Sequence, residues 1–440
     1  MPNARITAIK ALIKTENDEG YSNIVIDKAL DNDNLSRLDR AFASALFYGV
    51  LERKITLDYI LSKYLKNPVE KTDITVLTVL RCGIYQLKFM DKVPDNAAVN
   101  ESVKCAVSLK KHSAKGFVNA VLRSFIRDGK LVKAPKTELK TLSVKYSVPR
   151  WLVKSYINDF GKERAEKIMA AFLRSDYLSI RVNTRKIGTD KFLERLLSDG
   201  YNAKLSEICE DAIIIKSSGK IEDIYGFKQG YFHVQDVASQ LCAKALSVGK
   251  HDSVLDVCAA PGGKSFTIAE MTDNSVTACD LYEHKIKLIE SGAKRLGLDN
   301  IKAIVNDASK PNENFVEFDR VLCDLPCSGL GILGKKPEIR YKNVTFLDKL
   351  PSIQYHLLEV SSRYVAKGGL LIYSTCTLRH EENHDVANRF LNEHPEFEAV
   401  EILPQIKREI DEPKNMLTLM PYLYNTDGFF ISCFRKRGSE

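Results

Sequence analysis

The sequence contains no apolar run approaching the roughly 20 residues that a membrane-spanning helix needs. Its first residues, Met1–Arg5, lead into an amphipathic pattern and not into the apolar core of a signal peptide. It has ten cysteines but no C-x-x-C pair, so neither a zinc site nor a disulfide framework is indicated, and no metal is expected. These absences predict a cytoplasmic protein with reduced thiols and no membrane contact.

The composition is that of a globular chain, with 44% apolar and 28% charged residues. A length of 440 residues is too great for one ordinary hydrophobic core, so two or three domains are expected. The 65 basic residues outnumber the 57 acidic ones by eight. Such a mild excess favours a polyanionic partner without requiring one.

The first part of the chain, residues 1–128, has a helical pattern throughout. Apolar residues recur at spacings of three and four over Leu38–Val50, Ile74–Phe89 and Ala97–Val107, which predicts an all-α bundle. Residues 129–160 are predicted to form a Lys-rich linker and a connecting helix. Some basic side chains of the bundle could contact RNA, although a solvated helix face is the simpler interpretation of each: Lys104, Lys110, Lys111, Lys115 and Arg123.

The remainder is predicted to hold two α/β domains. Residues 161–235 form a small unit with helices at Glu163–Phe172 and Thr189–Leu197 and strands at Leu178–Val182 and Ala212–Ile215. In residues 236–440, strands alternate with helices such as Glu283–Leu296 and Ile353–Val365, which favours a parallel sheet with an antiparallel last strand. Its strands are expected at Val254–Val257, Val276–Cys279, Ala303–Val305, Val321–Cys323, Leu370–Tyr373, Leu417–Met420 and Phe429–Phe434.

The stretch Leu255–Lys264, L-D-V-C-A-A-P-G-G-K, has the pattern of a strand, a tight turn and the start of a helix. A phosphate-binding loop would need glycine where Cys258 stands. The dinucleotide pattern G-x-G-x-x-G is absent from this turn, and where it occurs, at Gly329–Gly334, no helical pattern follows. Neither nucleotide-binding motif is therefore favoured.

Three motifs occur in order: D-x-C-A-A-P-G-G-K from Asp256, D-L-P-C-S-G from Asp324 and S-T-C-T from Ser374. Together they resemble the RNA cytosine-C5 methyltransferase family, whose cofactor is S-adenosylmethionine. Motifs within Leu38–Arg123 resemble the helical RNA-binding antitermination fold, NusB, and the combination resembles the bacterial small-subunit (16S) ribosomal RNA members. The resemblance implies an all-α NusB-like domain, a small RRM-like α/β subdomain and a C-terminal Rossmann-like class I methyltransferase domain.

Four acids, Asp256, Asp280, Asp307 and Asp324, fall at predicted strand ends, where ligands of such sheets bind. Asp280 follows Asp256 by 24 residues, close to the offset of roughly 20 at which an acid meets ribose hydroxyls. A helix cap is the alternative for any one of them. The resemblance implies cofactor binding by Cys258, Ala259, Ala260, Pro261, Gly262, Gly263, Lys264, Asp280, Asp307 and Asp324.

Two cysteines, Cys327 and Cys376, follow predicted strands, and a thiol is the nucleophile that cytosine methylation at C5 requires. The residues alone do not rank them. The resemblance implies that Cys376 attacks C6, that Cys327 assists product release and that Asp324 contacts the base. One family departure is Leu325, where alanine is usual.

The expected partner is 16S rRNA before full subunit assembly, bound by a monomer. A transfer-RNA enzyme of the same chemistry is disfavoured by the NusB-like part. A non-catalytic RNA-binding scaffold is disfavoured because both cysteines and the turn are present.

Overall fold

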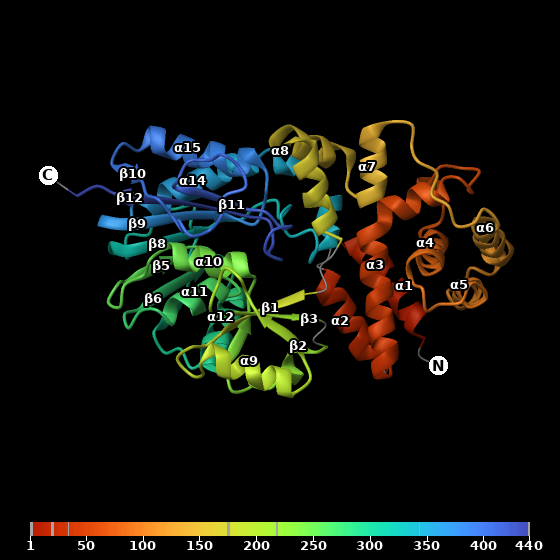
Figure 1. The fold of residues 1–440 in the computed structure, drawn as a ribbon, viewed down its shortest axis with the longest axis horizontal. Helices are drawn as coiled ribbons and strands as arrows, with labels where there is room; N and C mark the ends of the chain where they lie inside the picture. Colours follow the sequence, from red (N-terminus) through yellow and green to blue (C-terminus); the bar gives the residue numbers. More distant parts are fainter. Residues whose placement is uncertain are drawn as a thin grey trace. The chain divides into compact units, whose positions relative to one another are not determined.

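The computed structural model describes residues 3–18, 22–33, 35–173, 177–216, 219–342 and 344–438 (Figure 1). Contacts divide the chain into two units, a helical unit of residues 1–173 and 333–342 and an α/β unit of residues 174–332 and 343–440. Within the described ranges, no helix is both long enough and apolar enough to cross a membrane.

The helical unit confirms the predicted bundle. Its core is made by apolar side chains that recur at helical spacing, such as Leu46 and Phe47 of α3 and Val79 and Leu80 of α4. Asp73 caps the start of α4, because its carboxylate accepts hydrogen bonds from the backbone N–H groups of Thr75 and Val76. The helices are α1 (Ala4–Asp18), α2 (Ser22–Asn32), α3 (Arg37–Leu61), α4 (Ile74–Phe89), α5 (Asp95–Ser108), α6 (Lys115–Arg127), α7 (Glu138–Tyr146) and α8 (Arg150–Ala171).

The helix α7 lies inside the segment that the sequence suggested was a linker. Its Leu142 and Val144 are buried, and the carbonyl of Val144 accepts a hydrogen bond of 2.5 Å from Thr56 Oγ1 of α3. Lys140 and Lys145 flank these two residues, so the sequence was interpreted as a Lys-rich linker, yet α7 packs against α3. This segment is therefore part of the helical unit and not a free tether.

A second departure from the sequence prediction is the segment Leu333–Lys342, which belongs to the helical unit although it follows the D-L-P-C-S-G motif. It contains a short 3-10 helix, η4 (Pro337–Tyr341). The guanidinium of Arg340, which is 1% exposed, donates to the carbonyls of Glu52 at 2.6 Å and Ser147 at 3.2 Å. These bonds fix the segment to helices that lie far away in the sequence.

The α/β unit begins with a small antiparallel sheet of order β2-β3-β1-β4, with α9 packed against it. The predicted strands β1 and β3 and the helix α9 are confirmed. The short strands β2 and β4 were not predicted, because β2 is a largely exposed edge strand without apolar alternation. The elements are β1 (Tyr177–Val182), α9 (Thr189–Ser198), β2 (Asn202–Leu205), β3 (Ala212–Lys216) and β4 (Phe232–Val234).

The larger sheet has the order β10-β12-β9-β8-β5-β6-β7, with β11 paired to β12. The strands from β5 to β9 run parallel and β12 runs antiparallel to β9, as predicted. The short β10 was not predicted, and α14 begins and ends three residues earlier than expected. The elements are α10 (Val237–Ala245), β5 (Val254–Asp256), α11 (Gly263–Ala269), β6 (Val276–Asp280), α12 (Glu283–Leu296), β7 (Ile301–Val305), β8 (Phe318–Asp324), α13 (Val344–Leu347), α14 (Leu350–Ser362), β9 (Val365–Thr375), α15 (His384–Glu393), β10 (Phe397–Ala399), β11 (Met416–Leu419) and β12 (Phe429–Lys436).

Helices cover both faces of this sheet, with α10, α11 and α12 on one face and α14 and α15 on the other (Figure 1). Successive strand residues alternate between the two cores, as Val254 and Leu255 do in β5. The connections after β5 and after β8 therefore leave on opposite faces. In such sheets the crevice at the carboxyl ends of these two neighbouring strands binds the ligand.

Candidate active site

The turn between β5 and α11 is tight and requires a glycine. Gly262 has φ 111°, and a Cβ placed there would lie 2.3 Å from the ring of Phe266. The N–H of Ala259 donates to the carbonyl of Cys279 on β6 at 2.7 Å, which fixes the turn to the neighbouring strand. The Ala260–Pro261 peptide is cis.

A cavity of about 180 Å³ lies beside this turn. It is smaller than the roughly 300 Å³ at which typical small-molecule sites begin, so it can enclose only part of a nucleotide-sized ligand. Of the predicted residues, Cys258–Pro261, Gly263, Lys264 and Asp324 line it. Five further residues line the cavity, at the end of β4, the start of α10 and the end of β5: Val234, Gln235, Asp236, Ser239 and Asp256. Of these, the sequence had indicated only Asp256, as an acid at a strand end.

Two predicted acids, Asp280 and Asp307, lie outside the walls of this cavity. Asp280 ends β6, is buried, and accepts a 3.3 Å hydrogen bond from the N–H of Ala260, so it touches the turn. The ammonium group of Lys285 lies 3.1 Å from its other oxygen. Asp307 follows β7, and the hydroxyl and N–H of Ser309, which donate to it, lower its pKa.

Lys264, the last residue of the turn motif, is bonded to an acid of the site. Its Nζ lies 2.7 Å from Asp324 Oδ2, and Ser374 Oγ donates to Asp324 Oδ1 at 2.9 Å. Burial alone would lower the pKa of Lys264, but the negative charge of Asp324 outweighs it and the pKa lies above its ordinary value. Lys264 therefore stays charged and holds Asp324 in place.

The two predicted cysteines meet at the carboxyl edge of the sheet. Cys327 follows β8 and Cys376 follows β9, and because these strands are adjacent and parallel, the two Sγ atoms lie 3.1 Å apart. The hydrogen bond with Cys376, then burial, and also the carboxylate of Glu382 raise the pKa of Cys327 well above its ordinary value. Cys327 therefore keeps its proton at neutral pH, and its thiol lies within hydrogen-bond distance of the sulfur of Cys376.

The chain is 38% identical to a probable ribosomal RNA small subunit methyltransferase B of Bacillus subtilis, over 99% of both chains. The chain belongs to the 16S rRNA methyltransferase RsmB/F family. Its residues 243–435 match the methyltransferase domain of that family, and its residues 2–127 match the NusB family. Residues 148–222 match the ferredoxin-like domain of RsmF/B-like methyltransferases.

Other relatives agree with this membership. A protein of Synechocystis with the same description is 32% identical over 99% of this chain and 100% of its own. The crystal structure of PH0851 is 26% identical, covers 99% of both chains and superposes with a TM-score of 0.85. The predicted family, the predicted fold class and the predicted methyltransferase activity are thereby confirmed.

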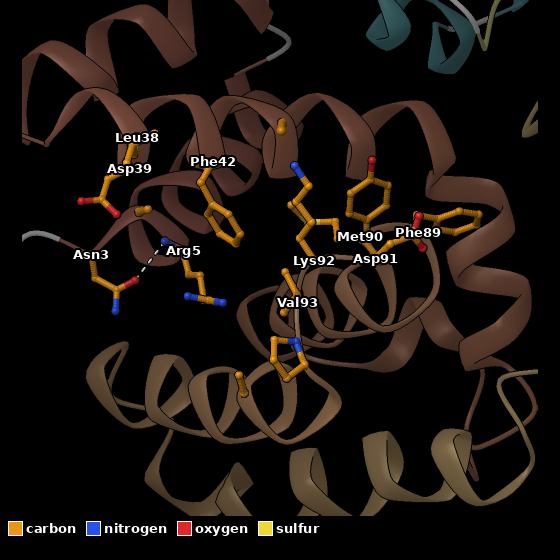
Figure 2. Close-up of a pocket in the computed structure, with 15 residues that line it drawn as sticks. Asn3, Arg5, Leu38, Asp39, Phe42, Phe89, Met90, Asp91, Lys92 and Val93 are labelled. Carbon is orange, nitrogen blue, oxygen red and sulfur yellow. Dashed lines mark hydrogen bonds between the residues drawn. The ribbon is translucent and has the colours of Figure 1, made fainter.

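The helical domain of this RsmB/F-family protein has a larger cavity, of about 830 Å³, between α1, α3, α4 and the loop that precedes α5 (Figure 2). Phe42, Phe89 and Val93 give it apolar walls, and the guanidinium of Arg5 lies over the Phe42 ring at 4.6 Å. Among the residues that the structure describes, its walls contain neither cysteine nor histidine. The two cysteines and the acids described above lie in the α/β unit.

The stability of the fold is predicted to depend on pH through Asp256, which lies at the wall of the smaller cavity. Burial raises its pKa to about 7 against the opposing hydrogen bond from Ser265, whereas an exposed aspartate titrates near 4. Between these values the folded chain holds a proton that the unfolded chain has released, so this residue's contribution to the free energy of unfolding falls as pH rises and is constant above about 7.

Asp256→Asn removes this titration. Relative to the unsubstituted protein, the variant is expected to become more stable from pH 5 to pH 8, by on the order of a few kcal/mol in the free energy of unfolding. Its melting temperature relative to that of the unsubstituted protein should rise accordingly. Thermal melting without added cofactor at several pH values measures it. Other buried acids, such as Glu270, make the same pH-dependent contribution in both proteins, so this contribution cancels when the variant is compared with the unsubstituted protein. A difference that does not change with pH would show that Asp256 is ionised throughout.

Proposed function

We propose that this chain transfers a methyl group from S-adenosylmethionine to C5 of a cytosine in 16S rRNA, through a covalent bond between Cys376 and C6. The observation that carries the proposal is the pair of cysteine sulfurs 3.1 Å apart at the ligand-binding edge of a methyltransferase sheet. One sulfur is needed as nucleophile and the other, in a separate role, for product release. A non-catalytic RNA-binding protein would not require two cysteine sulfurs in contact at this edge of the sheet.

The residues around the turn fit the proposed cofactor. Asp256 Oδ1 and Gln235 Nε2 at the cavity wall are buried and have no hydrogen-bond partner among the described residues, so polar atoms are available to a ligand. The cofactor, when bound, supplies a methyl group on a positively charged sulfur, which acidic surroundings suit. Cys258–Lys264 would hold its methionine part, Asp280 the ribose hydroxyls and Asp307 the adenine amino group, with Asp324 near the reacting end.

The protein's own groups account for the steps at the cytosine. The Cys376 sulfur adds to C6, which makes C5 electron-rich enough to take the methyl group. Loss of the C5 proton to a base and departure of the Cys376 thiolate then restore the C5–C6 double bond. The S–H of Cys327 stabilises the Cys376 thiolate before attack and again as it leaves. Asp324, fixed by Lys264 and Ser374, would contact the cytosine ring.

The proposed substrate is 16S rRNA before its full assembly into the subunit. The target base must leave its stack to reach the two sulfurs, and RNA that is not yet folded into a subunit allows this at lower cost. On the helical domain, Lys110, Lys115 and Arg123 are exposed and could contact phosphates, whereas Lys104 and Lys111 are already paired with Glu101 and Asp73. We propose a cytoplasmic monomer.

The test is to incubate the purified protein with 16S rRNA and methyl-labelled S-adenosylmethionine, digest the RNA and separate the nucleosides. All label is expected in 5-methylcytidine, and bisulfite sequencing of the same RNA then locates the cytosine. Label in any other nucleoside would contradict transfer to C5. Transfer RNA serves as the competing substrate, and preferential labelling of it would favour the transfer-RNA alternative.

A further inference from the structure

Glu382 is a fully buried acid, with 0% of its surface exposed, on the segment between Cys376 and α15. Its Oε2 accepts hydrogen bonds from the N–H of Ser328 at 2.9 Å and from Gln354 Nε2 at 3.0 Å. The same Gln354 nitrogen donates to the carbonyl of Pro326 at 3.0 Å. Glu382 and Gln354 thus hold the chain on both sides of Cys327.

Asn383, the next residue, is 1% exposed and holds the chain on both sides of the other cysteine, Cys376. Its Oδ1 accepts a hydrogen bond of 2.5 Å from Thr375 Oγ1, and its Nδ2 donates to the carbonyl of Thr377 at 3.0 Å. Both neighbours of Cys376 are therefore bonded to one amide side chain.

The two cysteine loops also contact each other behind the sulfurs. Ser328 Oγ donates to Thr377 Oγ1 at 2.8 Å, and both side chains are buried. In the described structure the side-chain hydrogen bonds of Glu382 go to Ser328 and Gln354, and those of Asn383 go to Thr375 and Thr377. None of these bonds goes to sulfur. Since the Sγ atoms are only 3.1 Å apart, these bonds determine how the two thiols face a base bound between strand ends.

We propose that Glu382 and Asn383 are positioning residues for different steps of the reaction, Glu382 for product release through Cys327 and Asn383 for attack through Cys376. This inference rests on the proposed function. It follows from the connectivity, because Glu382 is linked to both neighbours of Cys327, directly to Ser328 and through Gln354 to Pro326, whereas Asn383 is bonded to both neighbours of Cys376. Loss of either should therefore reproduce the defect of the cysteine it holds, and a general loss of stability should not.

The experiment follows the RNA–protein adduct and the methylated product over one turnover, on a denaturing gel with labelled cofactor. In Glu382→Ala, the ratio of adduct to released product is expected to rise at least tenfold, as is also expected in Cys327→Ala. In Asn383→Ala, adduct formation and methyl transfer are expected to fall together at least tenfold. Glu382→Gln should restore release, because its amide oxygen can accept the same two hydrogen bonds.

Two further variants separate positioning from folding. Gln354→Leu removes the bonds to Pro326 and to Glu382 but keeps the acid and its bond to Ser328. This variant should also accumulate adduct, so it tests the inference if Glu382→Ala does not fold. Glu270→Ala is the matched control, because it removes another buried acid of the same unit, paired with Arg181 at 3.1 Å. Whatever its folded fraction, its ratio of adduct to product should equal that of the unsubstituted protein.

The outcomes distinguish the inference from the proposed function. Adduct in Cys327→Ala but in neither Glu382→Ala nor Gln354→Leu would overturn the inference alone. Equal losses of attack and release in the Glu382 and Asn383 variants would also overturn it. Absence of adduct in Cys327→Ala itself would overturn the proposed function and, with it, the inference.

Discussion

Cys327→Ala is expected to become trapped on its RNA, whereas Cys376→Ala is expected to form no adduct and transfer no methyl group. Removal of a nucleophile typically costs several orders of magnitude, roughly 10³-fold or more in rate. Cys327 keeps its proton beside Cys376, with the two sulfurs 3.1 Å apart, so it is placed to assist the departure of Cys376. Without it, attack and methyl transfer remain possible and release does not.

The measurement is a denaturing gel of each variant with 16S rRNA and cofactor, in which an adduct migrates more slowly than free RNA. The cost of unstacking the target base is the same for both variants, so it cannot produce a difference between them. Cys105→Ala, which removes a buried thiol in the helical unit, is the control for loss of a cysteine as such. Adduct in Cys376→Ala but not in Cys327→Ala would exchange the two roles, and adduct in neither variant would contradict covalent catalysis.

The fold could be predicted largely from the sequence because its signals are local. The apolar spacing of α3 and α4 and the alternation of strands with helices after residue 250 are visible within short windows. The turn from Asp256 to Lys264 is equally local, since Gly262 must adopt a positive φ for the chain to reverse there. The two cysteines meet because adjacent parallel strands end at one edge, which the strand pattern already indicated.

The features that the sequence did not reveal depend on long-range contacts. Arg340 is buried against the carbonyls of Glu52 and Ser147, both more than 190 residues away, and nothing in its own neighbourhood indicates this. Glu382 resembles an ordinary acid of a charged segment, yet it holds Ser328 through a bond that spans 54 residues. Gln235 lies next to the predicted domain boundary, and only the packing of β4 and α10 beside the turn brings it to the cavity.

Asp280→Ala is expected to lower the affinity for S-adenosylmethionine by roughly 10²- to 10⁴-fold. The carboxylate ends β6 next to the turn and can accept hydrogen bonds from both ribose hydroxyls, each worth about 1.5–3 kcal/mol when the acceptor is charged. Asp280→Asn keeps one acceptor oxygen and should lose part of this. Isothermal titration calorimetry with the cofactor gives the dissociation constants directly.

A control is needed because Asp280 also accepts the N–H of Ala260 and pairs with Lys285, so its loss could act by loosening the turn. Lys285→Met removes the ion pair but keeps the carboxylate. If Asp280 binds ribose, Lys285→Met should retain cofactor affinity within a few-fold, since an ion pair with a partly exposed lysine contributes only about 0–1 kcal/mol. Equal losses in Asp280→Ala and Lys285→Met would assign the effect to the ion pair, and unchanged affinity in Asp280→Ala would place the ribose elsewhere on the sheet edge.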